Sequence, residues 1–232
     1  MEENNNALPT EEPKTGKKRN YKSATQRISE MKIATANAQH PPVADALKTV
    51  GYTDESLAAL QAEVAQVENL DLNQQKEYAD QYTETNKVDT KRADITQTYL
   101  KHLGLARIMF RNDTEAQVKL GLQGRQKRAY AAWLKDVKSF YAQLAGTPKL
   151  LEFALTRGIP QADIDAVQAE IAALEKLKES QKKETAEAQM ATEARDVKFD
   201  ELEEKYLEMI NYAKVLMGAD QALEALGIVV KR

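Results

Sequence analysis

The chain has 232 residues, a formal net charge of -3 and 42% apolar residues, which is enough for a packed core in one or two domains. It contains no cysteine, so disulfides, zinc-thiolate sites and thiol catalysis are excluded. Charged residues make up 30% and aromatic residues only 6%, a balance typical of long, partly solvated helices and not of a β-rich enzyme.

The beginning of the chain predicts neither a secretory signal nor a membrane anchor. Residues 1–12 are acidic and rich in asparagine, and no run of about 18 apolar residues occurs anywhere. Residues 1–20 combine charge, asparagine and proline with almost no apolar side chains, so burial cannot offset the entropy of ordering them. We therefore expect a disordered tail over residues 1–20 and, by default, a cytoplasmic protein.

The next segments predict helices of very different lengths. Residues 21–41 suit an N-terminal helix that stops before His40 and two prolines, and a short helix over residues 43–50 ends at Gly51. No glycine or proline then interrupts residues 52–103, where apolar side chains recur at spacings of three and four: Leu57, Leu60, Val64 and Val67. A helix from residue 52 to residue 110 has a length on the order of 85 Å.

The second half of the chain repeats the first. Placing Gly51 on Gly158 aligns GYTDESLAALQAEVAQVENL with GIPQADIDAVQAEIAALEKL, including a shared QAE triplet. Roughly 18 of about 60 positions are then identical, and one deletion brings AQVKLGL beside ALEALGI. The sequence predicts two helical repeats, residues 42–122 and 148–232, joined by a basic, Trp-containing linker helix over residues 123–147.

The linker restricts how the two long helices can lie. Its predicted helix, residues 125–145, is only about 33 Å long, so the long helices are expected to be antiparallel neighbours. The apolar start of each, residues 57–67 and 164–174, then faces the apolar end of the other. Because both helices turn polar in the middle, a solvated stalk should separate two apolar lobes. The predicted fold class is all-α, an internally duplicated elongated helical bundle with two long antiparallel helices and short connecting helices.

The linker also carries most of the candidate binding residues. Five cations stand against one acid, Asp136, and are candidate contacts to a partner or an anion: Arg125, Lys127, Arg128, Lys135 and Lys138. The preferred interpretation leaves them solvated, because four apolar side chains recur at helical spacing and suit packing on the long helices: Trp133, Val137, Phe140 and Leu144. A second basic cluster, residues 14–27, is interpreted as part of a solubilising tail, with anionic-surface binding as the alternative.

No catalytic or metal-binding motif occurs. A dimetal site in a helical bundle needs Glu-x-x-His, but Asn37 precedes His40 by three residues and Tyr99 precedes His102 by three. The abundant carboxylates are typical of a solvated face. We predict that the protein is not an enzyme and has no cofactor and no metal.

Three tyrosines on the long helix admit two interpretations of equal weight. Tyr78 and Tyr82 lie in the polar middle of the helix, and Tyr99 follows further along. They suit either packing between the antiparallel helices or contact with a partner.

Two segments, LGLQGRQKRAYAAWLKDVKSF at residues 120–140 and ALEALGIVVKR at residues 222–232, resemble patterns in uncharacterised bacterial all-helical proteins. The resemblance covers most of the chain after Pro42 and implies no known activity. It supplies no functional residue.

The predicted function therefore follows from the architecture. The duplicated long helices and the missing catalytic motif favour a non-enzymatic structural or protein-interaction scaffold of elongated form, which binds a protein partner or itself. The alternative is a protein that binds nucleic acid or an anionic surface through the basic linker helix and the basic N-terminal segment.

Overall fold

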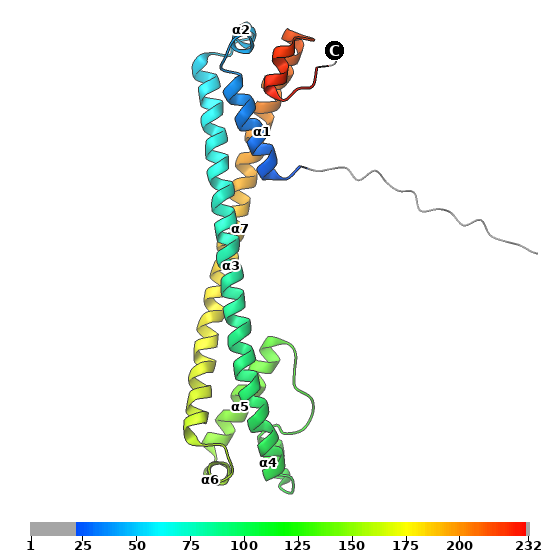
Figure 1. The fold of residues 1–232 in the computed structure, drawn as a ribbon. Helices are drawn as coiled ribbons and strands as arrows, with labels where there is room; N and C mark the ends of the chain where they lie inside the picture. The colour runs from blue at the N-terminus through cyan, green and yellow to red at the C-terminus, as the bar shows by residue number, and fades with distance from the viewer. Residues whose placement is uncertain (1–21, 231–232) are drawn as a thin grey trace, which may run out of the picture. The chain divides into compact units, whose positions relative to one another are not determined.

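The computed structural model describes residues 22–230, so the predicted disordered tail lies outside the described residues. Within residues 22–230 there is no strand, and the elements follow in the order α1 (Ala24–Asn37), α2 (Val43–Lys48), α3 (Asp54–Met109), α4 (Thr114–Lys119), α5 (Tyr130–Gly146), α6 (Pro148–Leu155), α7 (Gln161–Met217) and the 3-10 helix η1 (Gln221–Leu226) (Figure 1). The predicted all-α class is confirmed. In this part of the chain, no helix has both the length and the hydropathy needed to cross a bilayer.

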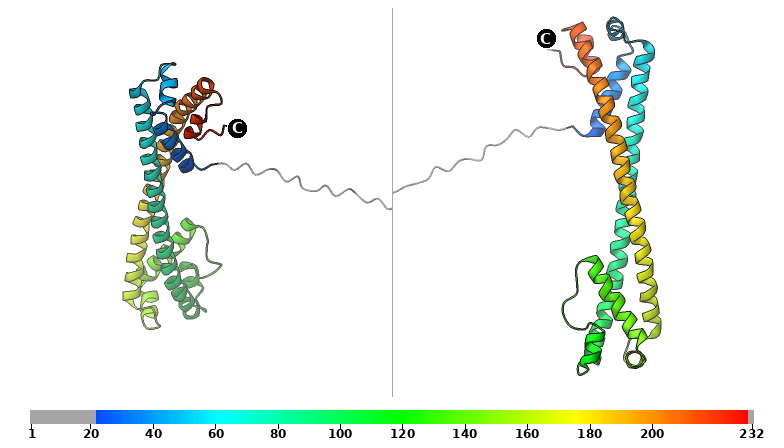
Figure 2. Two further views of the ribbon diagram at one scale, coloured as in Figure 1. Left: turned by 45° about the horizontal axis from the view of Figure 1, so that its top comes forward. Right: turned by 180° about the vertical axis from the view of Figure 1, so that it is seen from behind.

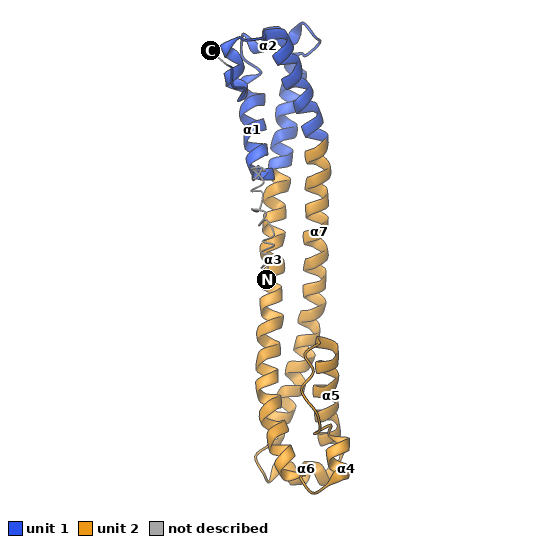
Figure 3. Ribbon diagram, turned by 90° about the vertical axis from the view of Figure 1, so that its right-hand side faces the viewer, with its two compact units in different colours: residues 1–68, 201–232 blue, residues 69–200 orange. Residues whose placement is uncertain are grey.

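The chain divides into two compact units that do not coincide with the predicted repeats. Unit 1 comprises residues up to 68 and from 201 onward, and unit 2 comprises residues 69–200 (Figure 3). Unit 1 therefore contains α1, α2, the start of α3, the end of α7 and η1. Unit 2 contains the rest of α3, then α4, α5, α6 and most of α7. Each unit combines the beginning of one long helix with the end of the other.

The two long helices are antiparallel within each unit. Three contacts in unit 2 show the direction: Asp71–Arg195 at 3.4 Å, Thr85–Gln181 at 3.0 Å and Lys91–Glu170 at 3.8 Å. Residues further along α3 contact residues earlier in α7. In unit 1, Lys205 of α7 pairs with Glu63 of α3 at 2.7 Å. Both long helices are continuous, including their polar middles. The predicted antiparallel pairing is confirmed in each unit.

The core of unit 2 is rich in aromatic side chains. Helix α5 buries one face, made of Trp133, Val137, Phe140, Tyr141 and Leu144. These residues belong to one cluster with the end of α3 and the start of α7, which supply Ile95, Leu103, Ile164, Val167 and Leu174 among others. The Phe140 ring meets the rings of Tyr99 and Tyr141 edge-on, with centroids 5.5 and 5.1 Å apart. The predicted packing role of the Trp133 face is confirmed.

Helix α5 begins later than the sequence predicts. The sequence predicts a helix that includes residues 125–129, but α5 starts at Tyr130 and the preceding residues are irregular. Two observations explain the difference: Gly124 has a φ of 91°, and its carbonyl accepts a hydrogen bond from Arg107 of α3 instead of from the next helical turn.

Unit 1 has a core of smaller side chains. Helix α1 begins at Ala24 because Ser23 and Gln26 form a reciprocal capping box at its N-terminus. It buries Ile28, Met31, Ala34 and Thr35. At its other end, Asn37 donates to the carbonyl of Ala225 in η1 at 2.7 Å, and the two elements lie close together in both views of Figure 2.

The two halves of the chain share local backbone geometry. The short helices α2 and α6 each lead to a glycine at positive φ, Gly51 at 95° and Gly158 at 94°, before a long helix begins. Helices α4 and η1 each follow an aspartate cap and lead to a second such glycine, Gly121 at 63° and Gly227 at 75°. The order of elements extends this correspondence upstream, since α5 precedes α6 as α1 precedes α2. Helix α5, predicted as a linker between repeats, is thus the counterpart of α1.

Candidate functional site

The irregular residues 120–129, here called the strap, connect α4 to α5. Arg107 of α3 holds the strap in place, because its Nε donates to the carbonyl of Leu122 at 2.8 Å and its Nη2 donates to that of Gly124 at 3.1 Å. Leu122 is buried, whereas residues 123–129 are exposed. A second α3 side chain, Arg92, donates to the carbonyl of Arg128 at 2.6 Å, so two arginines of α3 hold the strap.

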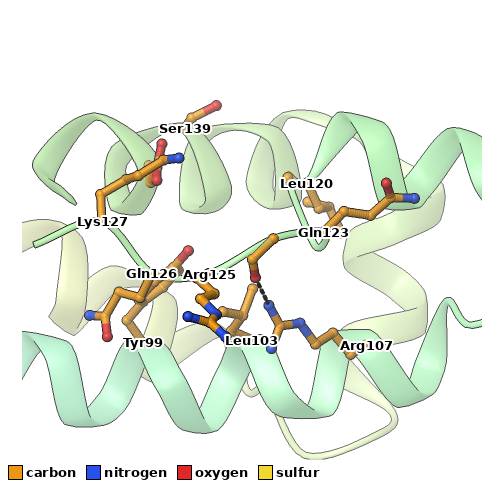
Figure 4. Close-up of a pocket in the computed structure, with 12 residues that line it drawn as sticks. Tyr99, Leu103, Arg107, Leu120, Gln123, Arg125, Gln126, Lys127 and Ser139 are labelled. Atoms are coloured by element: carbon orange, nitrogen blue, oxygen red, sulfur yellow. Dashed lines mark hydrogen bonds between the residues drawn. The ribbon is translucent and has the colours of Figure 1, made fainter. Parts of the chain in front are cut away.

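A cavity of about 210 Å³ lies between the strap, α3 and α5 (Figure 4). The charged side chains that line it are three cations, Arg107, Arg125 and Lys127, and one acid, Asp136. Within the described residues, none of these cations forms an ion pair with a carboxylate within 4.0 Å. Tyr99 and Ser139 are among the uncharged lining residues. Positive charge therefore exceeds negative charge in this cavity.

The Tyr99 hydroxyl stays a hydrogen-bond donor at neutral pH. Burial, and then the charge of Asp136, raises the pKa of Tyr99 above its ordinary value, while Arg107 acts in the opposite direction. Because its ring is buried in the core, the hydroxyl has a fixed position.

The structure brings together only two of the five cations that the sequence singles out. Arg125 and Lys127 line the cavity, whereas Lys138 pairs with Glu175 of α7 at 2.9 Å. Arg128 and Lys135 are not among the residues that line the cavity. The backbone carbonyl of Arg128 accepts a hydrogen bond from Arg92, and Lys135 is exposed on α5. Nucleic-acid or anionic-surface binding through this set stays a prediction.

Sequence reasoning missed Arg107, which completes the group of cations. It lies near the end of a long helix, outside the linker, and no motif marks it. Only the return of the chain through the strap brings it near Arg125 and into the lining of the same cavity as Lys127 (Figure 4).

Three carboxylates form a cluster in another part of unit 2. The carboxylate oxygens of Glu77, Glu184 and Glu187 lie within 4.8 Å of one another. Lysines on the same helices balance two of them, since Lys76 lies 3.4 Å from Glu77 and Lys183 lies 3.3 Å from Glu187. These ion pairs on a solvated helix surface account for the cluster.

His102 is completely buried and has two polar neighbours. Its Nδ1 lies 2.8 Å from the hydroxyl of Tyr141, and its Nε2 lies 3.6 Å from a carboxylate oxygen of Asp163, which is beyond hydrogen-bond distance. Burial lowers the pKa of His102, and the nearby Asp163 charge only partly opposes this effect. The carboxylate favours a proton on Nε2, so that Tyr141 donates to Nδ1. Because no face of the ring reaches solvent, we assign His102 to packing and not to catalysis.

A third region of interest is the stretch where unit 2 consists of two helices only, residues 69–91 of α3 and 179–200 of α7, here called the two-helix stretch. Tyr130, the first residue of α5, lies beside Arg92 and Lys178 and marks where the third helix begins. No other helix of unit 2 lies beside the stretch (Figure 3).

The tyrosines of α3 separate into two groups. Tyr78 and Tyr82 of the two-helix stretch are 57% and 69% exposed, whereas Tyr99 is 5% exposed in the core of unit 2. Packing therefore explains Tyr99. It does not explain Tyr78 and Tyr82, for which contact with a partner stays a prediction.

A groove of about 490 Å³ runs along the two-helix stretch between α3 and α7. Its apolar lining includes Tyr78, Ala188 and Val197. Its charged lining is entirely acidic within the described residues and consists of Glu193, Asp196 and Asp200. The groove is thus an exposed apolar surface with negative charge along its side.

Comparison of the chain with protein-family models, with curated proteins and with solved structures finds no match. No family is therefore assigned, and no residue takes its role from a relative. Function is inferred from the geometry of the two-helix stretch and of the strap cavity.

Proposed function

We propose that this chain is a non-enzymatic protein-interaction scaffold and that its partner binds on the two-helix stretch. One observation carries the proposal: large apolar side chains are exposed along a part of unit 2 that no third helix of this unit covers. Besides Tyr78 and Tyr82, these include Leu72 at 59% and Val197 at 51% exposure, and Tyr78 and Val197 line the groove itself. Helices in bundles normally bury such side chains against a neighbour, so this surface suits an additional helix.

The lining of the groove defines the chemistry of the partner. An amphipathic helix lays its apolar stripe into an apolar groove and contributes flanking charges to the rim. Because Glu193, Asp196 and Asp200 are the charged residues of this groove, the complementary helix carries lysine or arginine beside its apolar stripe. Asp196 already pairs with Arg195 at 2.6 Å, which leaves Glu193 and Asp200 as the main acidic contacts.

The proposal is tested by fluorescence anisotropy with two labelled helical peptides that share an apolar stripe and differ only in lysine or glutamate flanks. We expect the lysine peptide to bind the full chain and the glutamate peptide to bind at least about tenfold more weakly. The double variant Tyr78→Ser/Val197→Ser should lose most of the binding. The control is Ile108→Ser, which removes a 71% exposed side chain of α3 outside the stretch.

Equal binding of both peptides, or equal binding by the double variant and the wild type, would contradict the proposal. In the native host, a photo-crosslinking residue in place of Tyr78 should give a defined product that is absent with the same residue in place of Ile108. Each crosslinked protein should contain a basic amphipathic helix at the site of attachment.

A further inference from the structure

We propose that the cavity beneath the strap binds a phosphate group, held by Arg107, Arg125 and Lys127. This site is separate from the two-helix stretch and does not depend on the partner proposed there. The first observation is the charge of the cavity, where three cations face one acid and have no carboxylate within 4.0 Å among the described residues. Other cations of the protein, such as Lys32 and Lys205, have carboxylate partners at 2.7 Å.

The guanidinium group of Arg107 is preorganised for phosphate binding. Two of its five N–H groups are already used on the carbonyls of Leu122 and Gly124, which fixes the guanidinium plane on the strap. The remaining donors keep their direction, so little side-chain entropy is lost on binding. Guanidinium groups match the geometry of phosphate oxygens and form charge-assisted hydrogen bonds with them.

Neutral donors complete the wall of the cavity. Tyr99, Gln126 and Ser139 line the same space as the cations. Tyr99 remains protonated at neutral pH because burial and the charge of Asp136 raise its pKa, so its hydroxyl can donate to an anionic oxygen. Figure 4 shows Arg125, Gln126 and Lys127 on the strap and Tyr99 and Arg107 on α3.

The volume of the cavity limits the ligand. Pockets for drug-sized molecules have volumes of about 300–1,000 Å³, and this cavity has about 210 Å³. It therefore admits a phosphate group and not a whole nucleotide. The phosphate can be free or can belong to a lipid headgroup whose remainder stays outside.

Asp136 should oppose phosphate binding, whereas the lining cations should favour it. Its carboxylate lines the cavity and repels a bound anion, so removal of its charge should strengthen phosphate binding, whereas removal of a lining cation should weaken it. If these residues served only folding, Asp136→Asn and Arg125→Gln would not change the phosphate affinity in opposite directions.

The experiment is isothermal titration calorimetry of the full chain with inorganic phosphate at low ionic strength, together with thermal melting. We expect the double variant Arg125→Gln/Lys127→Gln to bind at least about tenfold more weakly and Asp136→Asn to bind more tightly. Phosphate should raise the melting temperature of the wild type and not that of the double variant. The matched control, Lys135→Gln, removes an exposed cation of α5 outside the cavity and should bind like the wild type.

A parallel arm measures sedimentation with vesicles of phosphatidylcholine, with or without phosphatidic acid. If the chain binds free phosphate but not the vesicles, the ligand is a soluble phosphate. If it binds vesicles that contain phosphatidic acid and the double variant does not, the ligand is the lipid headgroup. The proposal is overturned if neither probe binds, if Lys135→Gln weakens binding as much as the double variant, or if Asp136→Asn leaves the affinity unchanged.

Discussion

Unit 1 and unit 2 contain the same kinds of element in corresponding positions, but their cores differ in side-chain size. Where α1 of unit 1 buries Ala34, α5 of unit 2 buries Phe140. From Met31 and Val137 onward the two helices bury corresponding positions, whereas in the first turns Ile28 of α1 and Trp133 of α5 lie at different positions. The comparison shows that one pattern of buried positions accommodates cores of very different volume, provided that the facing helices adjust.

The buried polar groups of the two units differ in a second way. In unit 1 the Thr35 hydroxyl donates to the carbonyl of Met31 in its own helix at 2.8 Å. At the corresponding position of unit 2, the Tyr141 hydroxyl bonds to His102 of another helix, also at 2.8 Å. The Thr35 hydrogen bond stays within one helix and does not connect two helices. The Tyr141–His102 hydrogen bond connects α5 to α3 and so helps to fix how these two helices align.

The largest expected effect comes from converting a residue of unit 2 to its counterpart in unit 1. Phe140→Ala should reduce the free energy of unfolding by about 3–5 kcal/mol, because it removes a buried ring from the aromatic cluster. In unit 1, Ala34→Gly should cost only about 1 kcal/mol. Urea unfolding followed by the fluorescence of Trp133, the one tryptophan of the chain, reports on unit 2. A loss below 1 kcal/mol for Phe140→Ala would show that the ring is not tightly packed.

The two hydroxyl groups should also differ in their energetic value. Tyr141→Phe leaves Nδ1 of His102 buried without its partner and should cost about 1–3 kcal/mol. Thr35→Val removes a hydroxyl that bonds only within its own helix and should change stability by about 0.5 kcal/mol or less. Urea unfolding of both variants measures the difference. Equal losses would mean that the contact between helices adds nothing to the local one.

The smallest expected effect is on pH dependence. The pKa of His102 is lowered in the folded state, so below about pH 6.5 the unfolded chain binds a proton that the folded chain does not. The free energy of unfolding therefore keeps the full contribution of neutral His102 above that pH and decreases as the pH falls below it. His102→Met introduces the residue of the corresponding position, Met209, and should reduce the slope of unfolding free energy against pH by at most about 1.4 kcal/mol per unit. Urea titrations between pH 5 and 8 test this, and parallel slopes would contradict it.

Much of the helical framework was predictable from the sequence. Gly51 and Gly158 precede the starts of the long helices, and the spacing of Leu57, Leu60 and Val64 identifies a buried face. The antiparallel arrangement followed from the short reach of the chain between the long helices. These features depend on local pattern and chain length, which a single sequence contains.

The candidate site was only partly predictable. Arg125 and Lys127 were singled out as cations of the linker, but their position in an irregular strap depends on hydrogen bonds from Arg107, a residue in a different helix. No spacing rule connects a side chain to the carbonyls of a distant loop. The same limit applies to the two units, because each is formed by segments that are far apart in the sequence.

That division into units affects how the chain closes loops as it folds. Unit 2 is one continuous segment, residues 69–200, whereas unit 1 is formed by two segments that all of unit 2 separates. Assembly of unit 1 therefore closes a loop that contains the whole of unit 2, and its entropic cost grows with the length of that loop. Until this loop closes, α1 lacks its contact with η1, and this closure is the step at which aggregation competes with folding.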